Sequence, residues 1–310
     1  LIVKTSSLGD VIHNLPVVSD IRRHFPVAEI DWCVEESFAA IPRLHPGVGT
    51  IIPVAIRRWR KNLLNAKTWR EIAEFRRLLQ ARAYDAVVDT QGLLKSALIA
   101  SQASGPVLGY AADSAREPIA ARCYDRRFHV SRELHAVVRN LRLAGAALGY
   151  AAESEPDYGI EAVAAGFDWL PHRPYVVFLT ATSRDDKLWP EANWLALGQR
   201  LNHAGFAVAL AHGSSAERAV SDEIAKSVPD AWVWPTMGLD ALTDTMARCA
   251  GVVGVDSGLS HIAVALGLPH VQIYNFDTAW RTGPDNSAAD STHQVHVTGS
   301  PYPSIDGVWE

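Results

Sequence analysis

Short apolar runs alternate along the chain with longer segments whose apolar residues recur at helical spacing. The runs that resemble buried strands are residues 2–4, 30–34, 50–54, 86–89 and 107–110 in the first half, and 175–179, 206–210, 252–255 and 271–274, the last clear strand, in the second. The intervening segments are long enough for the helices that connect parallel strands. The pattern therefore predicts an α/β protein in which a strand–helix rhythm occurs twice.

The two halves of this pattern are separated by a stretch of different character. Residues 151–173 mix acidic residues with glycine and proline and show no clear periodicity. Such a composition is typical of the boundary between two compact units. We predict one domain over residues 1–160 and a second over residues 161–300, followed by a helix that begins within residues 301–310.

One stretch of the second half, residues 252–269, predicts a strand, a turn and a helix with a free N-terminus. Its apolar strand turns through Asp256, Ser257 and Gly258 and continues with apolar residues at helical spacing. Unpaired backbone N–H groups and a partial positive charge make such an N-terminus a natural binding site for phosphate. The ordinary interpretation is a plain strand-to-helix connection, so the neighbouring loops must decide between the two.

Polar side chains also follow the other strands of the second half. Because the carboxyl ends of parallel strands share one edge of a sheet, we expect these side chains to lie beside one crevice. They are Thr182, Ser183, Lys187, Glu217, Asp256, Ser257, Gly258 and His261. Hydroxyl groups, a lysine and a helix N-terminus together suit a diphosphate, whose departing charge Lys187 and backbone N–H groups would stabilise. Glu217 would then accept hydrogen bonds from ribose hydroxyls, and Met237 would line a base pocket.

Several of these residues have ordinary interpretations when each is taken alone. Lys187 is also explained as a surface lysine beside two aspartates, and His261 as a packing or capping residue. Asp10 follows the first strand, where a carboxylate is more often a helix cap than a catalyst. A serine hydrolase is excluded, because Asp256 and Ser257 are adjacent and the stretch is not G-x-S-x-G.

Residues 56–82 form a basic segment in a chain whose net charge is −5. This segment holds nine Lys and Arg residues against two Glu. Residues 67–82 predict an amphipathic helix with a solvated face. Four cations within five positions, in contrast, repel one another unless an anion meets them, and these are Arg57, Arg58, Arg60 and Lys61. We expect them to contact a phosphorylated or carboxylated amphiphile.

Composition narrows the remaining functional classes. The chain has 310 residues, of which 48% are hydrophobic, and no apolar run approaches the ~20 residues of a membrane span. The acidic balance argues against general nucleic-acid binding, and three widely spaced cysteines indicate a reducing cytoplasm. There is no D-x-D motif to hold a metal on a sugar diphosphate. A nicotinamide-dependent oxidoreductase is disfavoured, because the first loop contains only Gly9 where the dinucleotide fingerprint has three glycines.

Six motifs, in a fixed order between residue 2 and about residue 274, resemble those of the ADP-heptose:lipopolysaccharide heptosyltransferases, most closely the type I members of that family. The motifs are residues 3–10 (VKTSSLGD), 52–61 (IPVAIRRWRK), 89–97 (DTQGLLKSA), 115–118 (AREP), 183–190 (SRDDKLWP) and 255–261 (VDSGLSH). Several independent motifs in the family's order leave little room for chance.

The resemblance implies a GT-B architecture, in which two Rossmann-like parallel-sheet domains face a cleft. The N-terminal domain would bind the acceptor, the C-terminal domain would bind the nucleotide sugar, and the last helix would cross back to the first domain. The implied reaction moves L-glycero-D-manno-heptose from ADP-heptose to the first Kdo of Kdo2-lipid A, with inversion, without a cofactor and without an obligatory metal. The implied partners are a nucleotide-sugar donor, an anionic glycolipid acceptor and the inner face of the cytoplasmic membrane, with no nucleic acid.

The match to the family's motifs also implies residue roles. Asp10 would be the general base on the acceptor hydroxyl, and Lys187 would act on the departing diphosphate. The implied donor-binding residues are Thr182, Ser183, Lys187, Glu217, Met237, Asp256, Ser257, Gly258 and His261. The implied acceptor-binding residues are Arg57, Arg58, Arg60, Lys61 and Arg116.

The chain departs from the family's pattern after residue 274. Members often carry Gly-Pro-Thr-Asp-Pro there, whereas this chain continues Asn-Phe-Asp-Thr-Ala from Asn275, in a segment expected to be loop as far as residue 290. Trp280 and Arg281 would either contact the donor or pack the loop. Three alternatives remain: heptosyltransferase II, a family enzyme for another sugar, and a non-catalytic protein that binds nucleotides or lipids.

Overall fold

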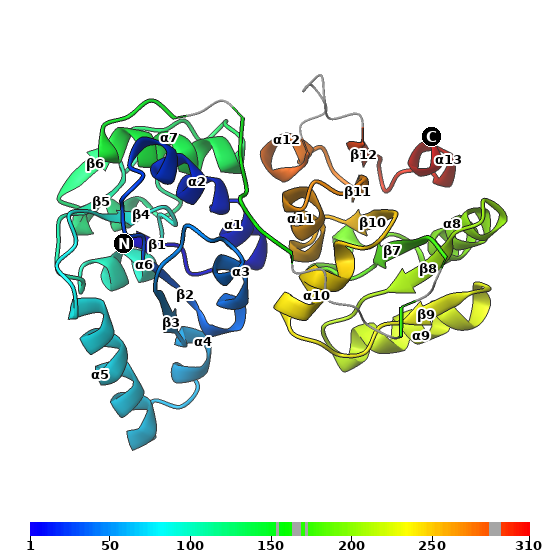
Figure 1. The fold of residues 1–310 in the computed structure, drawn as a ribbon, viewed down its shortest axis with the longest axis horizontal. Coiled ribbons are helices and arrows are strands. Elements are labelled where there is room, and N and C mark those ends of the chain that lie inside the picture. The colour runs from blue at the N-terminus through cyan, green and yellow to red at the C-terminus, as the bar shows by residue number, and fades with distance from the viewer. Residues whose placement is uncertain (153–154, 163–168, 171–172, 285–292) are drawn as a thin grey trace. The chain divides into compact units, whose positions relative to one another are not determined.

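The computed structural model describes residues 1–152, 155–162, 169–170, 173–284 and 293–310, which divide into two compact units. The first unit is Leu1–Glu161 and the second is Ala162–Glu310. Each consists of one parallel sheet with helices on both faces (Figure 1). The expected boundary region, residues 151–173, lies partly outside the described residues.

The sheet of the first unit has the strand order β3-β2-β1-β4-β5-β6, and all its pairs are parallel. Val3 of β1 lies opposite Cys33 on one side and Asp89 on the other. The order reverses between β1 and β4, and open sheets of this kind bind ligands beyond the carboxyl ends of the strands at such a switch point. The strands are β1 (Ile2–Val3), β2 (Trp32–Glu35), β3 (Ile51–Val54), β4 (Val87–Asp89), β5 (Val107–Tyr110) and β6 (Arg126–Phe128).

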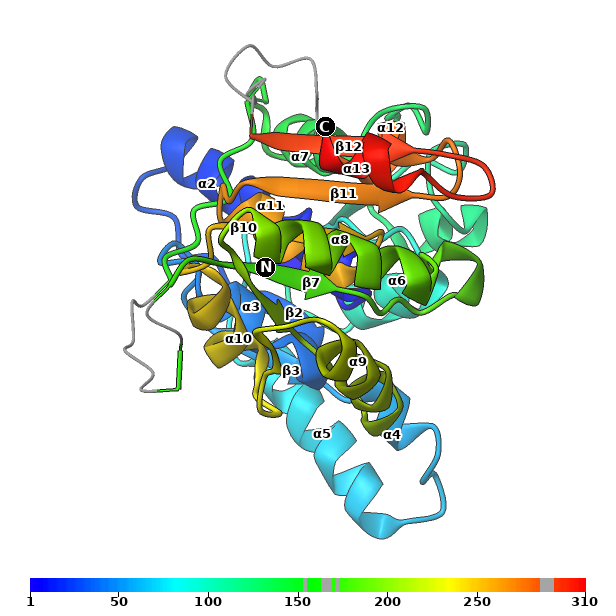
Figure 2. The ribbon, with the colours of Figure 1, turned by 90° about the vertical axis from the view of Figure 1, so that its right-hand side faces the viewer.

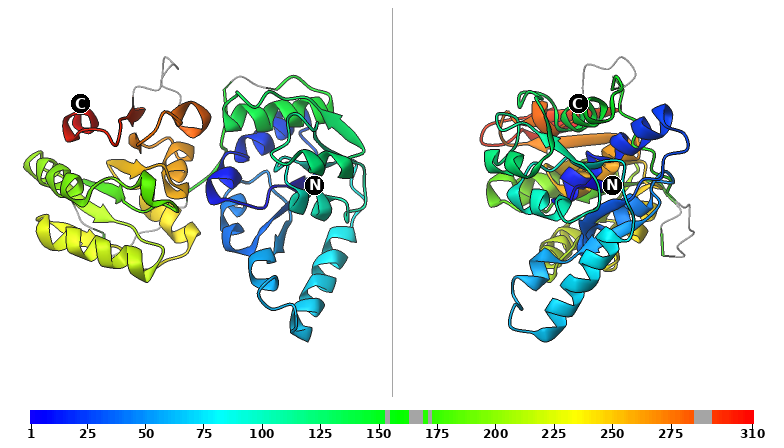
Figure 3. Two further views of the ribbon diagram at one scale, coloured as in Figure 1. Left: turned by 180° about the vertical axis from the view of Figure 1, so that it is seen from behind. Right: turned by 90° about the vertical axis from the view of Figure 1, so that its left-hand side faces the viewer.

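Helices cover both faces of this sheet (Figure 3). Alternate residues of a strand point to opposite faces, so Val87 packs with Phe75 and Ala97 on one face while Val88 packs with Leu143 on the other. The first face is covered by α5, α6 and η2, and the second by α7, against which α2 packs. The helical elements are α1 (Leu8–Ile12), α2 (Leu15–His24), η1 (Glu36–Phe38), α3 (Ala40–Arg43), α4 (Ile56–Trp59), α5 (Ala66–Gln80), α6 (Leu94–Ala100), η2 (Pro118–Cys123) and α7 (Ala136–Leu148).

The sheet of the second unit has the order β12-β11-β10-β7-β8-β9, again with parallel pairs. Numbered within its own unit, this is the same order as in the first sheet, and its switch point lies between β7 and β10. Both units therefore have the strand order of a doubly wound Rossmann fold. The strands are β7 (Tyr175–Leu179), β8 (Ala207–Leu210), β9 (Ala231–Val233), β10 (Gly251–Val255), β11 (His270–Tyr274) and β12 (Gln294–Thr298).

Helices α8, α9 and α13 lie on one face of the second sheet, and α10 and α11 lie on the other (Figure 2). Phe178 of β7 packs against Trp194 of α8, with ring centroids 4.8 Å apart. Helix α13 lies against α8, where Asp306 and Arg200 form an ion pair of 2.6 Å. The helical elements are η3 (Asp185–Lys187), α8 (Glu191–His203), α9 (Ser215–Ser227), α10 (Leu239–Met246), α11 (Gly258–Ala265), α12 (Ala279–Thr282) and α13 (Ile305–Trp309).

Three details differ from the sequence-based predictions. Strands β6, β9 and β12 are not predicted, and residues 271–274 are not the last strand, because these three edge strands are short or only half-buried and their apolar signal is weak. The single helix expected after β1 is two helices, α1 and α2, which meet at Asn14. The expected loop after β11 contains the short helix α12, and its part from residue 285 lies outside the described residues.

Candidate active site

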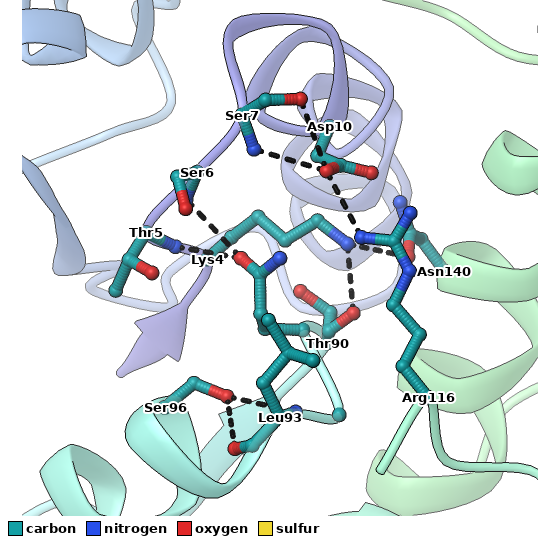
Figure 4. Close-up of polar contacts among 12 residues, drawn as sticks. Lys4, Thr5, Ser6, Ser7, Asp10, Thr90, Leu93, Ser96, Arg116 and Asn140 are labelled. Atoms are coloured by element: carbon teal, nitrogen blue, oxygen red, sulfur yellow. Dashed lines mark hydrogen bonds and ion pairs between the residues drawn. The ribbon is translucent and has the colours of Figure 1, made fainter.

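The carboxylate of Asp10 lies in the first turn of α1, at the switch point of the first sheet. Asp10 occupies the third position of this helix, and its Oδ2 accepts hydrogen bonds from the Ser7 backbone N (2.9 Å) and the Ser7 Oγ (3.2 Å) (Figure 4). The capping role that the sequence suggests for Asp10 is therefore real, with Ser7 as the N-cap residue. Asn14 is the N-cap residue of the next helix, α2.

Two cations surround this carboxylate. Arg116, from the loop after β5, donates from Nη1 to Asp10 Oδ2 at 3.1 Å, and Lys4 extends toward the same place from the end of β1. Burial alone would raise the pKa of the Asp10 carboxyl, but the charges of Lys4 and Arg116 and the hydrogen bond from Ser7 N hold that pKa below its ordinary value. Asp10 is therefore ionised at neutral pH, in a position where a proton acceptor is available.

Lys4 is a buried part of this site that the sequence analysis did not single out as a site residue. Its Nζ donates to the backbone oxygen of Thr90 (2.8 Å) and to Asn140 Oδ1 (3.2 Å). Burial lowers the pKa of the Lys4 ammonium to about 8, although Asp10 opposes this shift. A lysine that ends a wholly apolar strand is the signal that could have identified it.

Side chains from the loop after β4 and from α7 fix the segment that carries Asp10. Gln91 Oε1 accepts hydrogen bonds from the backbone N atoms of Thr5 (3.0 Å) and Ser6 (3.2 Å), across the switch point. Asn140 donates from Nδ2 to the backbone oxygen of His13 (3.0 Å), where α1 ends. The start of α1 and its end are thus both held by side chains from other elements, which limits the positions that the carboxylate can take.

At the switch point of the second sheet, Lys187 and Asp256 form an ion pair. Lys187 Nζ lies 2.5 Å from Asp256 Oδ2, and both side chains are partly exposed. Thr182 donates from Oγ1 to the backbone oxygen of Asp256 (3.0 Å), and Nε2 of the buried His261 lies 3.8 Å from Asp256 Oδ1. Four of the predicted donor-binding residues, from the loops after β7 and β10 and from α11, are therefore brought together.

Helix α11 begins beside this ion pair, as the sequence predicts. Ser257 is its N-cap residue, and the Ser257 Oγ accepts a hydrogen bond from the Ser260 backbone N at 3.4 Å. Gly258 is the first helical residue. Gly254, in the preceding strand β10, leaves room for the helix, because a Cβ there would lie 2.4 Å from the Ser260 Oγ. The helix N-terminus and the Lys187 ammonium form a positively polarised region suited to a phosphate group.

The loop that carries Lys187 is held by Asn275, the first residue of the segment that departs from the family's pattern. Asn275 donates from Nδ2 to the backbone oxygens of Asp186 (3.0 Å) and Leu188 (2.9 Å), on either side of the lysine. This contact could not be predicted from the sequence, since it joins residues 87 to 89 positions apart.

The other predicted donor-binding residues lie in the loops after β7, β8 and β9. Ser183 is exposed in the loop after β7. Glu217 lies in the first turn of α9, where its Oε2 accepts a hydrogen bond from the Gly213 backbone N (2.6 Å). Met237 Sδ accepts a hydrogen bond from Thr245 Oγ1 at 3.8 Å. These loops share the sheet edge of Lys187 and Asp256, but the hydrogen bonds that the described residues make keep Glu217 and Met237 within their own segments.

The basic run at α4 is more internally compensated than the sequence suggests. Arg58 donates from Nε and Nη2 to the two carboxylate oxygens of Glu36 (both 3.0 Å) and from Nη1 to Glu71 (2.6 Å). Arg57 lies over the ring of Phe38, 5.0 Å from its centroid. Carboxylates of this chain therefore already pair with Arg58, and its predicted contact with an acceptor stays a prediction. The exposed Arg60 and Lys61 have no ion pair within the part of the chain that the structure describes.

The described residues also contain no group of three or more His, Cys, Asp or Glu side chains placed to hold a metal ion. None of the helices in those residues is long and apolar enough to cross a membrane.

The chain is similar in sequence to a known protein family and to several of its members. The profile of the family described as glycosyltransferase family 9 (heptosyltransferase) matches residues 72–303. The chain is 43% identical over 305 residues to lipopolysaccharide heptosyltransferase 1 of Pseudomonas aeruginosa, covering 98% of this chain and 84% of that protein. It is 42% identical to lipopolysaccharide heptosyltransferase 1 of Escherichia coli strain K12 over 281 residues, covering 88% of this chain and 86% of that protein.

The fold of the chain also closely resembles that of a solved structure. Escherichia coli heptosyltransferase WaaC with ADP aligns with a TM-score of 0.90 and 38% identity, over 99% of this chain and 97% of that one. The same enzyme with ADP-2-deoxy-2-fluoro heptose aligns with a TM-score of 0.86 and 37% identity, over 99% of this chain and 96% of that one. The architecture of two parallel-sheet units is therefore the GT-B-like fold of the heptosyltransferases, and this chain belongs to glycosyltransferase family 9, the heptosyltransferase family.

Proposed function

We propose that this protein is a lipopolysaccharide heptosyltransferase that moves L-glycero-D-manno-heptose from ADP-heptose to the first Kdo of Kdo2-lipid A. The observation that carries the proposal is the identity of 42–43% to lipopolysaccharide heptosyltransferases 1 over most of the chain. Solved structures of a similar heptosyltransferase with ADP and with ADP-2-deoxy-2-fluoro heptose support ADP-heptose as the donor.

In this reaction Asp10 is the general base. Its carboxylate takes the proton from the acceptor hydroxyl while the hydroxyl oxygen attacks the anomeric carbon of the heptose. The bond from that carbon to the phosphate oxygen breaks on the opposite side, so the configuration is inverted and ADP leaves with the electron pair. The lowered pKa makes Asp10 a weak base, so proton transfer accompanies sugar departure rather than preceding it. A base in this role contributes on the order of 10²–10⁴-fold to the rate.

The second unit binds the donor in this proposal. Lys187 and the N-terminus of α11 stabilise the charge that develops on the departing diphosphate, a task that a divalent metal performs in other sugar transferases. Asp256 holds the Lys187 ammonium in place, and Thr182 fixes the backbone of Asp256. The other donor-binding residues are Ser183, Glu217, Met237, Ser257, Gly258 and His261. No cofactor and no obligatory metal take part.

The first unit binds the acceptor in this proposal. Arg60 and Lys61 are exposed, and the Arg116 side chain, although it binds the catalytic carboxylate, is 42% exposed, so all three can contact the carboxylates and phosphates of an anionic glycolipid. Arg57 and Arg58, in α4, add to the positive electrostatic field that attracts this acceptor. The enzyme then works in the cytoplasm, as a peripheral protein on the inner face of the inner membrane, and binds no nucleic acid.

One assay tests the proposal. The protein is incubated with ADP-heptose and Kdo2-lipid A in buffer that contains a chelator, and ADP release is followed with and without the acceptor. We expect acceptor-dependent ADP release and a product heavier by one heptose. An acceptor that already carries the first heptose serves as the parallel arm. ADP release only with the acceptor that already carries the first heptose, or a strict need for a divalent metal, would contradict the proposal.

A further inference from the structure

The connection between α4 and α5 exposes a cluster of large apolar side chains. We call residues 60–70 the α4–α5 tip, which projects beyond the edge of the first sheet (Figures 1 and 3). Leu64 is fully exposed, and Leu63 and Trp69 expose 51% and 57% of their surface. Adjacent apolar residues exposed to this degree are costly in water and commonly mark an interaction surface.

The tip is held in shape by its own hydrogen bonds. Trp69 donates from the indole Nε1 to the backbone oxygen of Leu63 (2.8 Å), which ties the ring to the turn that carries the two leucines. Asn65 caps α5 by accepting from the Lys67 backbone N (2.9 Å), and Asn62 donates to the backbone oxygen of Arg58 (3.1 Å). The apolar side chains are therefore displayed by a folded turn rather than by a loose strand of chain.

The charge around these side chains has one sign. Arg60, Lys61, Lys67 and Arg70 are exposed within the α4–α5 tip, and the tip contains no acidic residue, although the whole chain has a net charge of −5. Glu36 and Glu71 lie outside the tip; both pair with Arg58, and Glu71 also lies 4.0 Å from the Lys67 ammonium. Exposed leucines and a tryptophan interspersed with exposed cations match the interface of an anionic bilayer, where apolar groups enter and cations remain at the phosphates.

We propose that the α4–α5 tip docks the protein on an anionic phospholipid surface. Leu63 and Leu64 enter the acyl boundary, Trp69 lies at the level of the headgroups, and Arg60, Lys61, Lys67 and Arg70 contact lipid phosphates. This inference rests on the proposed function only for the biological purpose of docking, which is to bring the enzyme to a glycolipid acceptor embedded in such a surface. Docking itself depends on the tip alone.

The test compares Leu64→Glu with a matched control, Val27→Glu. Val27 also lies in the first unit and is 93% exposed, but belongs to the turn after α2. Each full-length protein is mixed with sucrose-loaded vesicles of phosphatidylglycerol and phosphatidylethanolamine, and with vesicles of phosphatidylcholine alone, and sedimented. We expect wild type and Val27→Glu to bind the anionic vesicles and Leu64→Glu to lose about tenfold in partition. Equal binding by Leu64→Glu and wild type, or equal loss in both variants, would overturn the proposal.

A second measurement separates docking from altered folding and from self-association. Brominated lipids are expected to quench the fluorescence of wild type more than that of Trp69→Phe, because only the former carries an indole at the interface. Quenching that does not differ between the two would contradict the depth assigned to Trp69. Light scattering without vesicles is expected to give the same mass for wild type and Leu64→Glu. A larger mass for wild type that this variant abolishes, without vesicle binding, would identify a second copy as the occupant and overturn the proposal.

The catalytic consequence keeps the two proposals distinguishable. Leu64→Glu is expected to retain wild-type transfer to a deacylated acceptor in solution and to lose transfer to the same acceptor embedded in anionic vesicles. If wild type transfers no heptose to either acceptor, the proposed function fails while vesicle partition still tests the docking surface. If Leu64→Glu and wild type use the embedded acceptor equally well, the docking surface is refuted and the proposed function stands.

Discussion

At the switch point of the first sheet, the carboxylate of Asp10 lies among cations, whereas at the switch point of the second sheet the ammonium group of Lys187 is bound to a carboxylate. The two sheets have the same strand order, and both groups follow the first strand of their unit. Topology thus determines where the functional groups lie. The residues placed there determine the sign of the charge, and therefore which kind of ligand each unit can activate or stabilise.

The two arrangements also differ in how the central group is held. Asp10 is bound by Arg116 and influenced by the buried Lys4, whose own pKa is lowered by burial. Lys187 is bound directly by Asp256, and both remain partly exposed. The first arrangement keeps a carboxylate ionised and fixed, which suits proton abstraction. The second presents a cation whose partner can be exchanged for a phosphate oxygen.

The largest effect is expected from Asp10→Asn, which retains the volume of the side chain but removes the proton acceptor. We predict a fall in kcat on the order of 10²–10⁴-fold, measured as acceptor-dependent ADP release at neutral pH. The helix cap should survive, because the amide oxygen can still accept from Ser7 N. A variant that turns over at the wild-type rate would exclude Asp10 as the base.

Lys187→Met is expected to rank second. Loss of the ammonium removes charge stabilisation from the departing diphosphate, so we predict a fall in kcat/KM of about 10²-fold and weaker ADP binding. Lys226→Met provides the control, since Lys226 lies on the solvent face of α9 and forms a local ion pair with Glu223 at 2.7 Å. If the two variants behave alike, Lys187 has no role at the phosphate.

Lys4→Met should change the pH profile more than the maximal rate. The positive charge of Lys4 lowers the pKa of Asp10, so its removal raises that pKa toward neutrality. We predict that the acidic limb of the kcat/KM profile moves to higher pH, because Asp10 is then protonated at a pH where wild type is still active. An unchanged acidic limb with reduced activity would mean that Lys4 is only a packing residue.

The smallest effect is expected from Asn275→Ala. This change removes two hydrogen bonds to the backbone on either side of Lys187, which should lower the free energy of unfolding of the second unit by roughly 1–2 kcal/mol. Urea denaturation measures this difference. We also expect ADP to bind more weakly, but less so than in Lys187→Met. Unchanged stability and ADP affinity would mean that the loop is positioned by other contacts.

Much of the fold follows from the sequence because buried parallel strands produce continuous apolar runs. Runs such as 175–179 and 252–255 correspond to central strands β7 and β10. The edge strands β6 and β12 escape prediction because one side of each has no partner, and polar residues such as Arg126 and Gln294 are tolerated there. Their placement depends on pairing with β5 and β11, which a local pattern does not contain.

The site was predictable where its residues lie in the segment that follows the carboxyl end of a strand. Asp256 comes directly after β10, and Asp10 and Lys187 lie in the first short helical elements after β1 and β7, so the rule that ligands bind at the carboxyl ends of strands identifies them. The contacts that tune them could not be predicted, since Asn140 reaches Lys4 across 136 positions and Arg116 reaches Asp10 across 106. The internal pairing of Arg58 with Glu36 and Glu71 was missed for the same reason.

In this proposal the two switch points divide the work, with the base in the first unit and the diphosphate site in the second, and calorimetric titration with ADP can separate these two roles. Wild type, Asp10→Asn and Lys187→Met are titrated under identical conditions, and the same samples are assayed for turnover. We expect Asp10→Asn to bind ADP like wild type but to transfer almost no heptose, and Lys187→Met to bind ADP more weakly. Loss of ADP affinity in Asp10→Asn together with wild-type affinity in Lys187→Met would contradict the proposal.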